Sequence, residues 1–223
     1  MKNIAMIPAR MGSQRLAKKN LAQLGGIPLI SRAIRKTREA NVFDEIWVNS
    51  EHPAFGDIAC EEGVHFHQRP EHLGNNHATS EQFVTEFLHA HNCDFLFQVH
   101  SIAPLLGLKD IRGFAQEMQS DRWDCLLSTE PIQIECAYQD MPVNFSWEAK
   151  TNSQDLHPVQ RISWSITAWR RSTFLEAAAA GRCATYAGRV GFFPVSQMAS
   201  HVIKTADDLR IAEALLPLLE ERS

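Results

Sequence analysis

The sequence predicts an α/β protein built on a doubly wound, mostly parallel sheet with helices on both faces. Short apolar segments alternate with amphipathic segments of helical length along most of the 223 residues, and this alternation is typical of such a sheet. Segments such as "NIAMIPA" and "CDFLFQVHS" are nearly continuous in apolar residues, as expected for strands that are covered on both faces. Strand–helix–strand units of this kind are connected by right-handed crossovers.

The predicted elements follow from periodicity and from signals at helix ends. Thr79 or Ser80 opens one helix, with Glu81 in its first turn, Gly63 closes another, and Thr205 is the expected N-cap of the last. The predicted strands cover residues 3–9, 45–50, 64–67, 93–101 and 124–130, and a further strand begins the segment 161–181. The predicted helices cover residues 28–41, 53–63, 79–92, 108–120, the remainder of 161–181, and 205–223.

The alternation breaks between residues 131 and 160, where tryptophan and prolines interrupt the pattern. We therefore expect a single domain over residues 1–223, with residues 131–160 forming a small inserted region. The segment suits a hairpin, a lid or a dimerisation element.

Composition limits the classes of partner. Charged residues make up 22% of the chain and the formal net charge is −4, which argues against binding to nucleic acid or to an anionic membrane surface. The five cysteines are scattered singly, which favours a reducing, cytoplasmic location. No apolar run approaches the length of a membrane span, and the first apolar stretch is too short for a signal sequence. Any cationic site must therefore be local.

One local cationic segment follows the first predicted strand. In "IPARMGSQRLAKKN", residues 7–20, Gly12 and Ser13 can offer backbone N–H groups and a hydroxyl. Four cations accompany them: Arg10, Arg15, Lys18 and Lys19. Loops after strands of an open parallel sheet are favoured ligand sites. Since the spacing of the glycines fits neither the P-loop nor the dinucleotide fingerprint, the residues alone predict a loop that binds a polyanion, or else an ordinary solvated basic loop.

The same residues carry a resemblance to a known family. "IPARMGSQRLAKKNL" followed by "LGGIPLISRAI" resembles the N-terminal signature of the acylneuraminate cytidylyltransferases, or CMP-sialic acid synthetases. "FDEIWVNSE", "RPEHLGNNHATS", "APLLGLKDI" and "KTADDLRIAEALL" extend the resemblance in order along most of the chain. It implies a nucleotide-diphospho-sugar transferase-like fold, transfer of CMP from CTP to an acid sugar for a surface polysaccharide, release of pyrophosphate, magnesium as the usual metal, and a homodimer.

The resemblance also implies roles for individual residues. The residues expected to bind the nucleotide are Arg10, Met11, Gly12, Ser13, Gln14, Asn20, Arg69, Ser80 and His100. The expected catalytic residues are Arg10, Lys19 and Lys204. Arg161 is expected either to bind the carboxylate of the substrate, since guanidinium groups bind carboxylates bidentately, or to form a structural salt bridge.

Several positions depart from the family pattern. Gln14 stands where the family has lysine, His100 where it has glutamine, and Leu106 where it has arginine. Val202 and Lys204 replace the two aspartates that hold the family's metal. The metal ligands in this chain are therefore unassigned.

Three interpretations of these replacements stay open. Lys204 can replace the metal as a fixed cation near the phosphates. Magnesium can instead be held by the triphosphate together with Asp207 or Asp208. The third interpretation is a catalytically impaired homologue that binds a nucleotide or sugar as a regulatory or partner protein. A basic-loop domain that binds another phosphorylated metabolite is an alternative from a different class.

The histidines include two further candidates. His65 and His67 alternate on a predicted strand and share a face, with His72 and His77 nearby, which suits a transition metal. No cysteine or carboxylate completes a ligand spacing, so ordinary surface histidines are the alternative. His100 should lie at the carboxyl end of its strand, as a titrating base or as a hydrogen-bonding group.

Two tryptophans leave similar alternatives open. Trp147 and Trp164 can either stack on a ligand or pack in the core or at a dimer contact.

Overall fold

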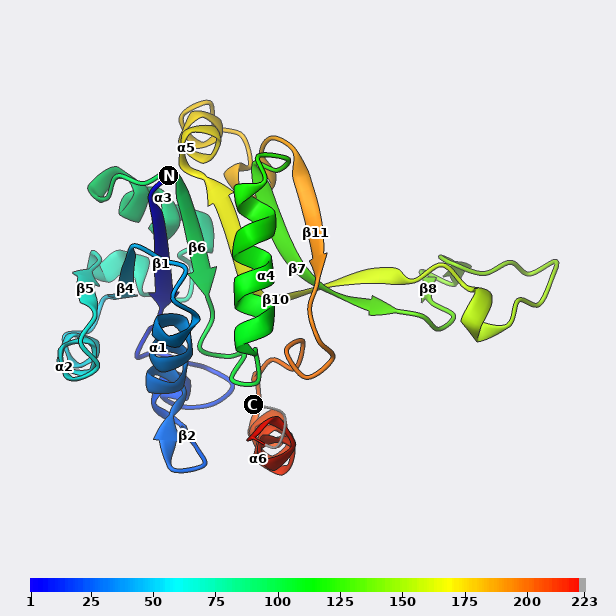
Figure 1. Ribbon diagram of the computed structural model, residues 1–223, viewed down its shortest axis with the longest axis horizontal. Helices are drawn as coiled ribbons and strands as arrows, with labels where there is room; N and C mark the ends of the chain where they lie inside the picture. Colours follow the sequence, from blue (N-terminus) through cyan, green and yellow to red (C-terminus); the bar gives the residue numbers. More distant parts are fainter. Residues whose placement is uncertain (221–223) are drawn as a thin grey trace.

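A seven-stranded sheet forms the centre of the protein in a computed structural model that describes residues 1–220. The strands are β1 (Asn3–Pro8), β4 (Glu45–Ser50), β5 (His65–Gln68), β6 (Phe95–Val99), β7 (Cys125–Ile132), β10 (Val159–Arg170) and β11 (Val190–Pro194). They lie in the order β11-β7-β10-β6-β1-β4-β5 (Figure 1). Neighbouring strands are parallel except where β10 runs antiparallel to β6 and β7. The predicted mostly parallel sheet is confirmed.

Helices cover both faces of the sheet. On one face α1 (Leu29–Ala40), α2 (Ala54–Glu61) and α4 (Leu108–Gln119) bury their apolar sides in a common core, and Figure 1 shows α1 and α4 in front of the strands. On the other face α3 (Ser80–Ala90) and α5 (Arg171–Ala179) bury Phe87 and Phe174 against the sheet. The result is the three-layer arrangement that the alternating sequence predicts.

The predicted helix ends agree with the structure. Thr79 caps α3 through a reciprocal capping box with Gln82, and Gly63 follows α2 with a φ of +69°, a left-handed conformation that glycine adopts without strain. Thr205 and Asp208 form the same kind of box at the start of α6 (Ala206–Glu220). The last three residues of the helix predicted over 205–223 lie outside the described residues.

The sequence pattern missed a short hairpin and the edge strand β11. The hairpin joins β2 (Gln23–Leu24) to β3 (Ile27–Pro28), and each strand is too short to show a period. Leu24 packs against Leu29 and against Leu216 of α6 in a separate small core. Because α6 is anchored there, the residues that precede it lie beside the loop that follows β6, where the N–H of Ile203 donates to the carbonyl oxygen of Ile102.

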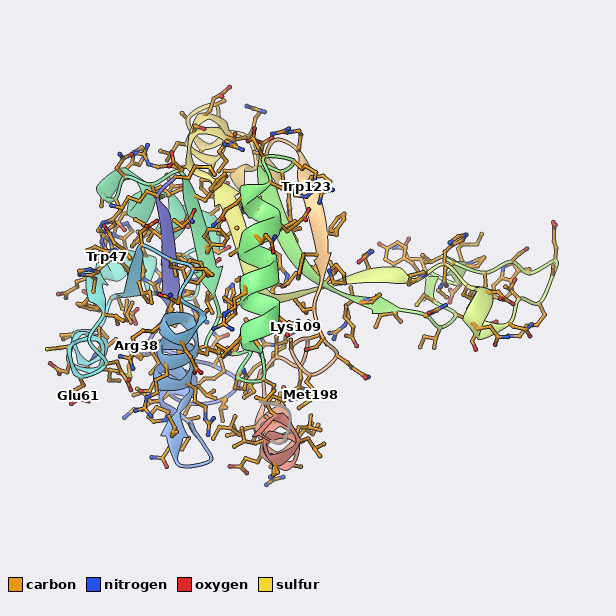
Figure 2. The ribbon with its side chains drawn as sticks, in the orientation of Figure 1. Arg38, Trp47, Glu61, Lys109, Trp123 and Met198 are labelled. Atoms are coloured by element: carbon orange, nitrogen blue, oxygen red, sulfur yellow. The ribbon has the colours of Figure 1, made fainter. Side chains whose placement is uncertain are left out.

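An arm, residues 133–158, projects from the sheet between β7 and β10 (Figure 1). It contains the two-residue strands β8 (Ala137–Tyr138) and β9 (Met141–Pro142) and a 3-10 turn at Ser153–Asp155. In Figure 2 its side chains stand apart from the body of the protein, and Trp147 is 69% exposed. The arm lies within the segment 131–160 that was predicted as an insertion.

No helix in the described part of the chain is long and apolar enough to cross a bilayer.

Candidate functional site

The carboxyl ends of four parallel strands meet at one edge of the sheet. Arg10 follows β1, Glu51 follows β4, Arg69 follows β5 and His100 follows β6. Ligands of open parallel sheets bind at this edge, and the cationic loop that follows β1 lies there as the sequence predicts.

Arg69 joins three of these strand ends from a buried position. Its side chain is 3% exposed. It donates from Nη2 to the carbonyl oxygen of Ala9 at 3.0 Å and to Oε2 of Glu51 at 3.1 Å, and from Nη1 to Oδ1 of Asn49 at 3.0 Å. The guanidinium also lies over the ring of Phe83, 4.7 Å from its centroid. Burial lowers the pKa of Arg69, while the charge of Glu51 acts against that shift.

Further hydrogen bonds hold the opening loop, residues 10–18, which has no regular secondary structure. Glu51 accepts the backbone N–H of Met11 with its second oxygen, Oε1, at 2.8 Å. Asn20 donates to the carbonyl oxygen of Arg10 at 2.9 Å and accepts the hydroxyl of Ser101 at 2.7 Å. The start of the loop is therefore held by the partly buried Glu51 and the buried Asn20.

The loop and the strand ends enclose a first cavity of about 250 Å³. Its charged lining residues are all cationic: Arg10, Arg15, Lys19 and Arg69. Burial is the main cause that lowers the pKa of Lys19, and the neighbouring charges of Arg15, Arg10 and Lys204 lower it further. Like charges gathered at this density favour an anionic ligand, because an anion relieves their mutual repulsion.

A β-bulge in β10 opens a second cavity beside the first. β10 pairs with β6 from Ile166 to Arg170, and its register with β7 shifts between Ile162 and Thr167. At the bulge Trp164 has a φ of +57°, a conformation that costs a bulky side chain about 1–2 kcal/mol. Bulges of this kind often redirect a side chain beside a site.

The strained backbone at the bulge is supported by a hydroxyl network. The Oγ of Ser128 accepts the N–H groups of Ser165 and Ile166, each at 3.1 Å. The hydroxyl of Ser163 donates to the same oxygen at 2.9 Å. These buried bonds hold Trp164 in its unusual conformation, and such outliers persist where the surroundings enforce them.

The second cavity has a volume of about 310 Å³ and is less charged than the first. Its lining residues are Ser80, Gln98, His100, Ile102, Arg161, Ile162, Ser163, Trp164, Val202 and Lys204. The Nε of Arg161 donates to Glu130 at 2.8 Å, so Arg161 forms a salt bridge while half of its side chain stays exposed. Both alternatives considered for Arg161 are thus compatible with its position. Trp164 supplies the aromatic part of the wall.

His100 and Ile102 line both cavities and mark their junction. The backbone N–H of His100 donates to the carbonyl oxygen of Ser165 at 3.1 Å. Burial, with a smaller effect from the charge of Lys19, lowers the pKa of His100 to about 4. The imidazole is therefore neutral at pH 7 in the free protein.

The structure places most of the predicted site residues around these two cavities. The first is lined by Arg10, Ser13, Gln14, Lys19, Asn20, Arg69 and His100, and the second by Ser80, His100, Arg161 and Lys204. Met11 and Gly12 line neither cavity. Because the N–H of Met11 is already bonded to Glu51, it is not a free donor for a phosphate.

Some lining residues were not predicted. Gln98 and Phe83 belong to segments of ordinary pattern, although a lone amide in the apolar run "FLFQV" is a signal that could have identified Gln98. Leu106, which stands where the family has arginine, is buried in the core rather than in either cavity.

The residues at the site do not match a magnesium site held by the protein. No carboxylate is among the lining residues of either cavity within residues 1–220, although magnesium prefers hard oxygen ligands. Asp208 accepts the backbone N–H groups of Lys204 and Thr205, and Asp207 pairs with Arg210 at the surface. Across the described chain, no group of three or more His, Cys, Asp and Glu side chains is placed to share a metal ion.

The histidine pair on β5 takes part in side-chain packing. His65 stacks on Trp47 with ring centroids 4.6 Å apart. His67 contacts Glu86 at 2.9 Å and His91 at 2.9 Å. Both histidines therefore have packing or hydrogen-bond partners among the described residues.

The fold and the paired cavities define an α/β protein with a cation-lined cavity at the carboxyl edge of its sheet. The chain belongs to the cytidylyltransferase family, whose model matches residues 4–211.

Individual relatives agree with this family. The chain is 28% identical over 172 residues to N-acylneuraminate cytidylyltransferase A of Danio rerio, covering 72% of this chain and 38% of that protein. It is 34% identical over 123 residues to the pseudaminic acid cytidylyltransferase of Campylobacter jejuni, covering 52% of this chain and 53% of that protein. The matched regions thus span about half or less of the length of these relatives.

Solved structures share the fold at lower identity. CMP:2-keto-3-deoxy-manno-octonic acid synthetase, complexed with CTP, superposes with a TM-score of 0.73 at 17% identity over 98% of this chain and 99% of that one. The 4-diphosphocytidyl-2C-methyl-D-erythritol synthase of Anaerococcus prevotii gives a TM-score of 0.69 at 13% identity over 97% of this chain and 98% of that one.

The buried pair of Arg69 and Glu51 leads to a prediction about stability. Glu51→Ala should lower the free energy of unfolding by roughly 3–5 kcal/mol, because it leaves a buried guanidinium without its counter-charge. Urea unfolding at pH 7 measures the difference. Glu135→Ala removes the partner of Lys150 in an exposed pair and should cost no more than about 1 kcal/mol. Equal losses in the two variants would contradict this account of the site.

Proposed function

We propose that this protein transfers CMP from CTP to an acid sugar and releases pyrophosphate. The observation that carries the proposal is the junction of two cavities, one lined by four cations, at the carboxyl edge of the sheet in a chain of the cytidylyltransferase family. The first cavity suits the triphosphate of CTP, and the second, which adjoins it at His100, suits the acceptor. Acid sugars are supported as the acceptor class by the names of the relatives that act on N-acylneuraminate and pseudaminic acid.

The residues of the first cavity bind and neutralise phosphate in this proposal. In-line phosphoryl transfer depends mostly on positioning and on stabilisation of charge. Arg10 and Lys19 contact the phosphates, while Ser13 and Asn20 complete the polar wall. In the second cavity the half-exposed guanidinium of Arg161 is available to the carboxylate of the sugar. The carboxylate thereby fixes the orientation of the acceptor hydroxyl.

Lys204 supplies a cation where the lining residues offer no carboxylate for a metal. It lines the second cavity and acts electrostatically on Lys19 of the first, so it lies near the position where charge develops between the two substrates. Fixed cations at such positions stabilise the transition state. Magnesium stays a prediction from the family resemblance, and no step proposed here passes through it.

The proposal is tested by release of pyrophosphate from CTP with a panel of nonulosonic and ulosonic acids as acceptors. We expect release with at least one acid sugar and none with the corresponding neutral sugars, because the second cavity presents cations to a carboxylate. Titration calorimetry with CTP separates binding from transfer. If CTP binds and no acid sugar is turned over, the catalytically impaired homologue replaces the enzyme; if CTP does not bind, both are wrong.

Replacement of Lys204 should reduce transfer more than binding. We expect Lys204→Ala to lower kcat by about 100-fold, the effect typical of removing one charge-stabilising group from an active site. Lys204→Arg should retain a larger share of kcat because it keeps the charge. Steady-state kinetics for CTP and the acid sugar give both parameters.

The control for this measurement is Lys109→Ala. Lys109 lies on α4 (Figure 2) and lines neither cavity, so its replacement should leave kcat unchanged. A kcat for Lys204→Ala within twofold of the wild type would show that this lysine does not replace a metal.

We also propose a homodimer formed through the arm. Five large hydrophobic side chains are exposed along it: Ile134, Tyr138, Met141, Val143 and Trp147. Such a concentration of apolar surface on a projecting segment marks an interaction site. A second copy of the chain is the partner that the family resemblance favours.

The cysteines of the described chain are unpaired, which supports a cytoplasmic location for this assembly.

Light scattering coupled to size-exclusion chromatography tests the arm. We expect the wild-type protein to have the mass of a dimer and Trp147→Glu to shift it to the monomer, because a buried charge opposes association. Ile211→Glu changes an exposed hydrophobic residue on α6 instead and should leave the mass unchanged. A monomeric wild type at tens of micromolar protein would exclude the proposed dimer.

A further inference from the structure

His100 occupies the position where two bound substrates would meet. It lies beyond the end of β6, lines both cavities, and is fixed by hydrogen bonds on both sides of its backbone. Its N–H donates to Ser165 at 3.1 Å and its carbonyl oxygen accepts from Ala103 at 3.2 Å. The position of its ring is therefore set by β6, by the bulge in β10 and by the loop that follows.

The imidazole has no polar partner in the described structure. Its Nε2 atom is buried and makes no hydrogen bond to any described residue, and the other ring nitrogen has none assigned to it. Buried polar atoms without partners are uncommon, and each calls for an explanation. A ligand that fills the cavities and bonds to the ring supplies one.

Resting on the transfer proposed above, we propose that His100 is the catalytic base that accepts the proton of the acceptor hydroxyl. The hydroxyl oxygen forms a bond to the α-phosphorus of CTP while its proton passes to a ring nitrogen of His100. The bond from that phosphorus to the bridging oxygen breaks, and pyrophosphate leaves with the electron pair. The imidazolium returns its proton to pyrophosphate or to water, and the base is regenerated.

The charges around the two cavities suit this role. The charged residues that line the two cavities joined by His100 are all cations: Arg10, Arg15, Lys19, Arg69, Arg161 and Lys204. In the free protein, burial and the charge of Lys19 lower the pKa of His100 to about 4, so the ring is neutral and able to take a proton. Bound triphosphate adds negative charge beside Lys19, which favours the imidazolium and raises that pKa.

Binding of CTP and protonation of His100 are therefore coupled. NMR titration of the ring protons should show the pKa of His100 rising when CTP is bound, with the resonance assigned by its absence in His100→Gln. This measurement does not depend on turnover. An unchanged pKa in the CTP complex would overturn the proposal, because a group that meets the α-phosphate must sense the charge of the nucleotide.

Kinetics supply the second readout. His100→Gln keeps a hydrogen-bonding side chain but cannot titrate. We expect it to lower kcat at least about 100-fold while the Kd for CTP changes little. In the wild type, kcat should fall as the pH drops through the pKa of His100 in the ternary complex, and this acid limb should be missing in the variant.

Another titrating group, Lys36 of α1, contacts the loop that follows β6. Lys36 donates to the carbonyl oxygen of Ala103, and burial lowers its pKa to about 7. Its effect on the pH profile is common to the wild type and to His100→Gln, so the difference between the two profiles reports His100. His89→Gln, an exposed position on α3, is the matched control and should leave kcat and its pH profile unchanged.

The outcomes distinguish this proposal from the transfer on which it rests. A wild-type protein that binds no CTP, or that turns over no acid sugar, contradicts the transfer itself before any variant is made. A wild-type enzyme that is active, with His100→Gln retaining kcat within twofold and the same pH profile, contradicts only the role of His100. Thermal unfolding confirms that the variant is folded, and His100→Asn provides a second non-titrating side chain.

Discussion

The site depends on one buried guanidinium. Arg69 joins the ends of β1, β4 and β5 through Ala9, Asn49 and Glu51, and Glu51 in turn holds the amide of Met11 in the opening loop. A charge removed from water in this way is tolerated only when a counter-charge and hydrogen bonds compensate it. The same contacts that compensate Arg69 therefore fix the loop, and the geometry of the first cavity follows from the need to keep one cation satisfied.

The other cations of the first cavity are not compensated in this way. Lys19 is half-buried among Arg10, Arg15 and Lys204, and its pKa is lowered by burial and by all three neighbours. The free site thus retains electrostatic repulsion among its cations. Relief of this repulsion would contribute to the free energy of binding a polyanion. Because no acidic side chain of the described residues lines either cavity, the walls present only positive charge to a ligand.

Much of the fold could be predicted from the sequence because its signals are local. The apolar run "NIAMIPA", the helical spacing of Ile30, Ala33 and Ile34, and the cap at Thr79 each depend on a few neighbouring residues. The placement of the basic loop followed from a general property of parallel sheets. The antiparallel direction of β10 could not be predicted, since a run of buried residues has the same pattern in either direction.

The second cavity and the hydrogen-bond partners of the polar groups at the site also could not be predicted from the sequence. The bulge at Trp164 depends on hydrogen bonds that Ser128 accepts from Ser163 and Ser165, 35 and 37 residues further along the chain. The amide of Met11 was expected to bind phosphate, but it is engaged by Glu51, 40 residues further on. Such long-range pairings leave no periodic signal, whereas residues named from the family resemblance, such as Asn20, Arg69 and Lys204, line the two cavities.

Trp164 gives the protein an intrinsic fluorescent probe of the second cavity. The indole forms part of the wall of the second cavity and lies 6.5 Å from the ring of Tyr186, whereas Trp169 is almost completely buried in the core. An indole that changes from water to the face of a bound molecule changes its emission. Occupancy of that cavity is therefore coupled to the intrinsic fluorescence of the chain, without any label.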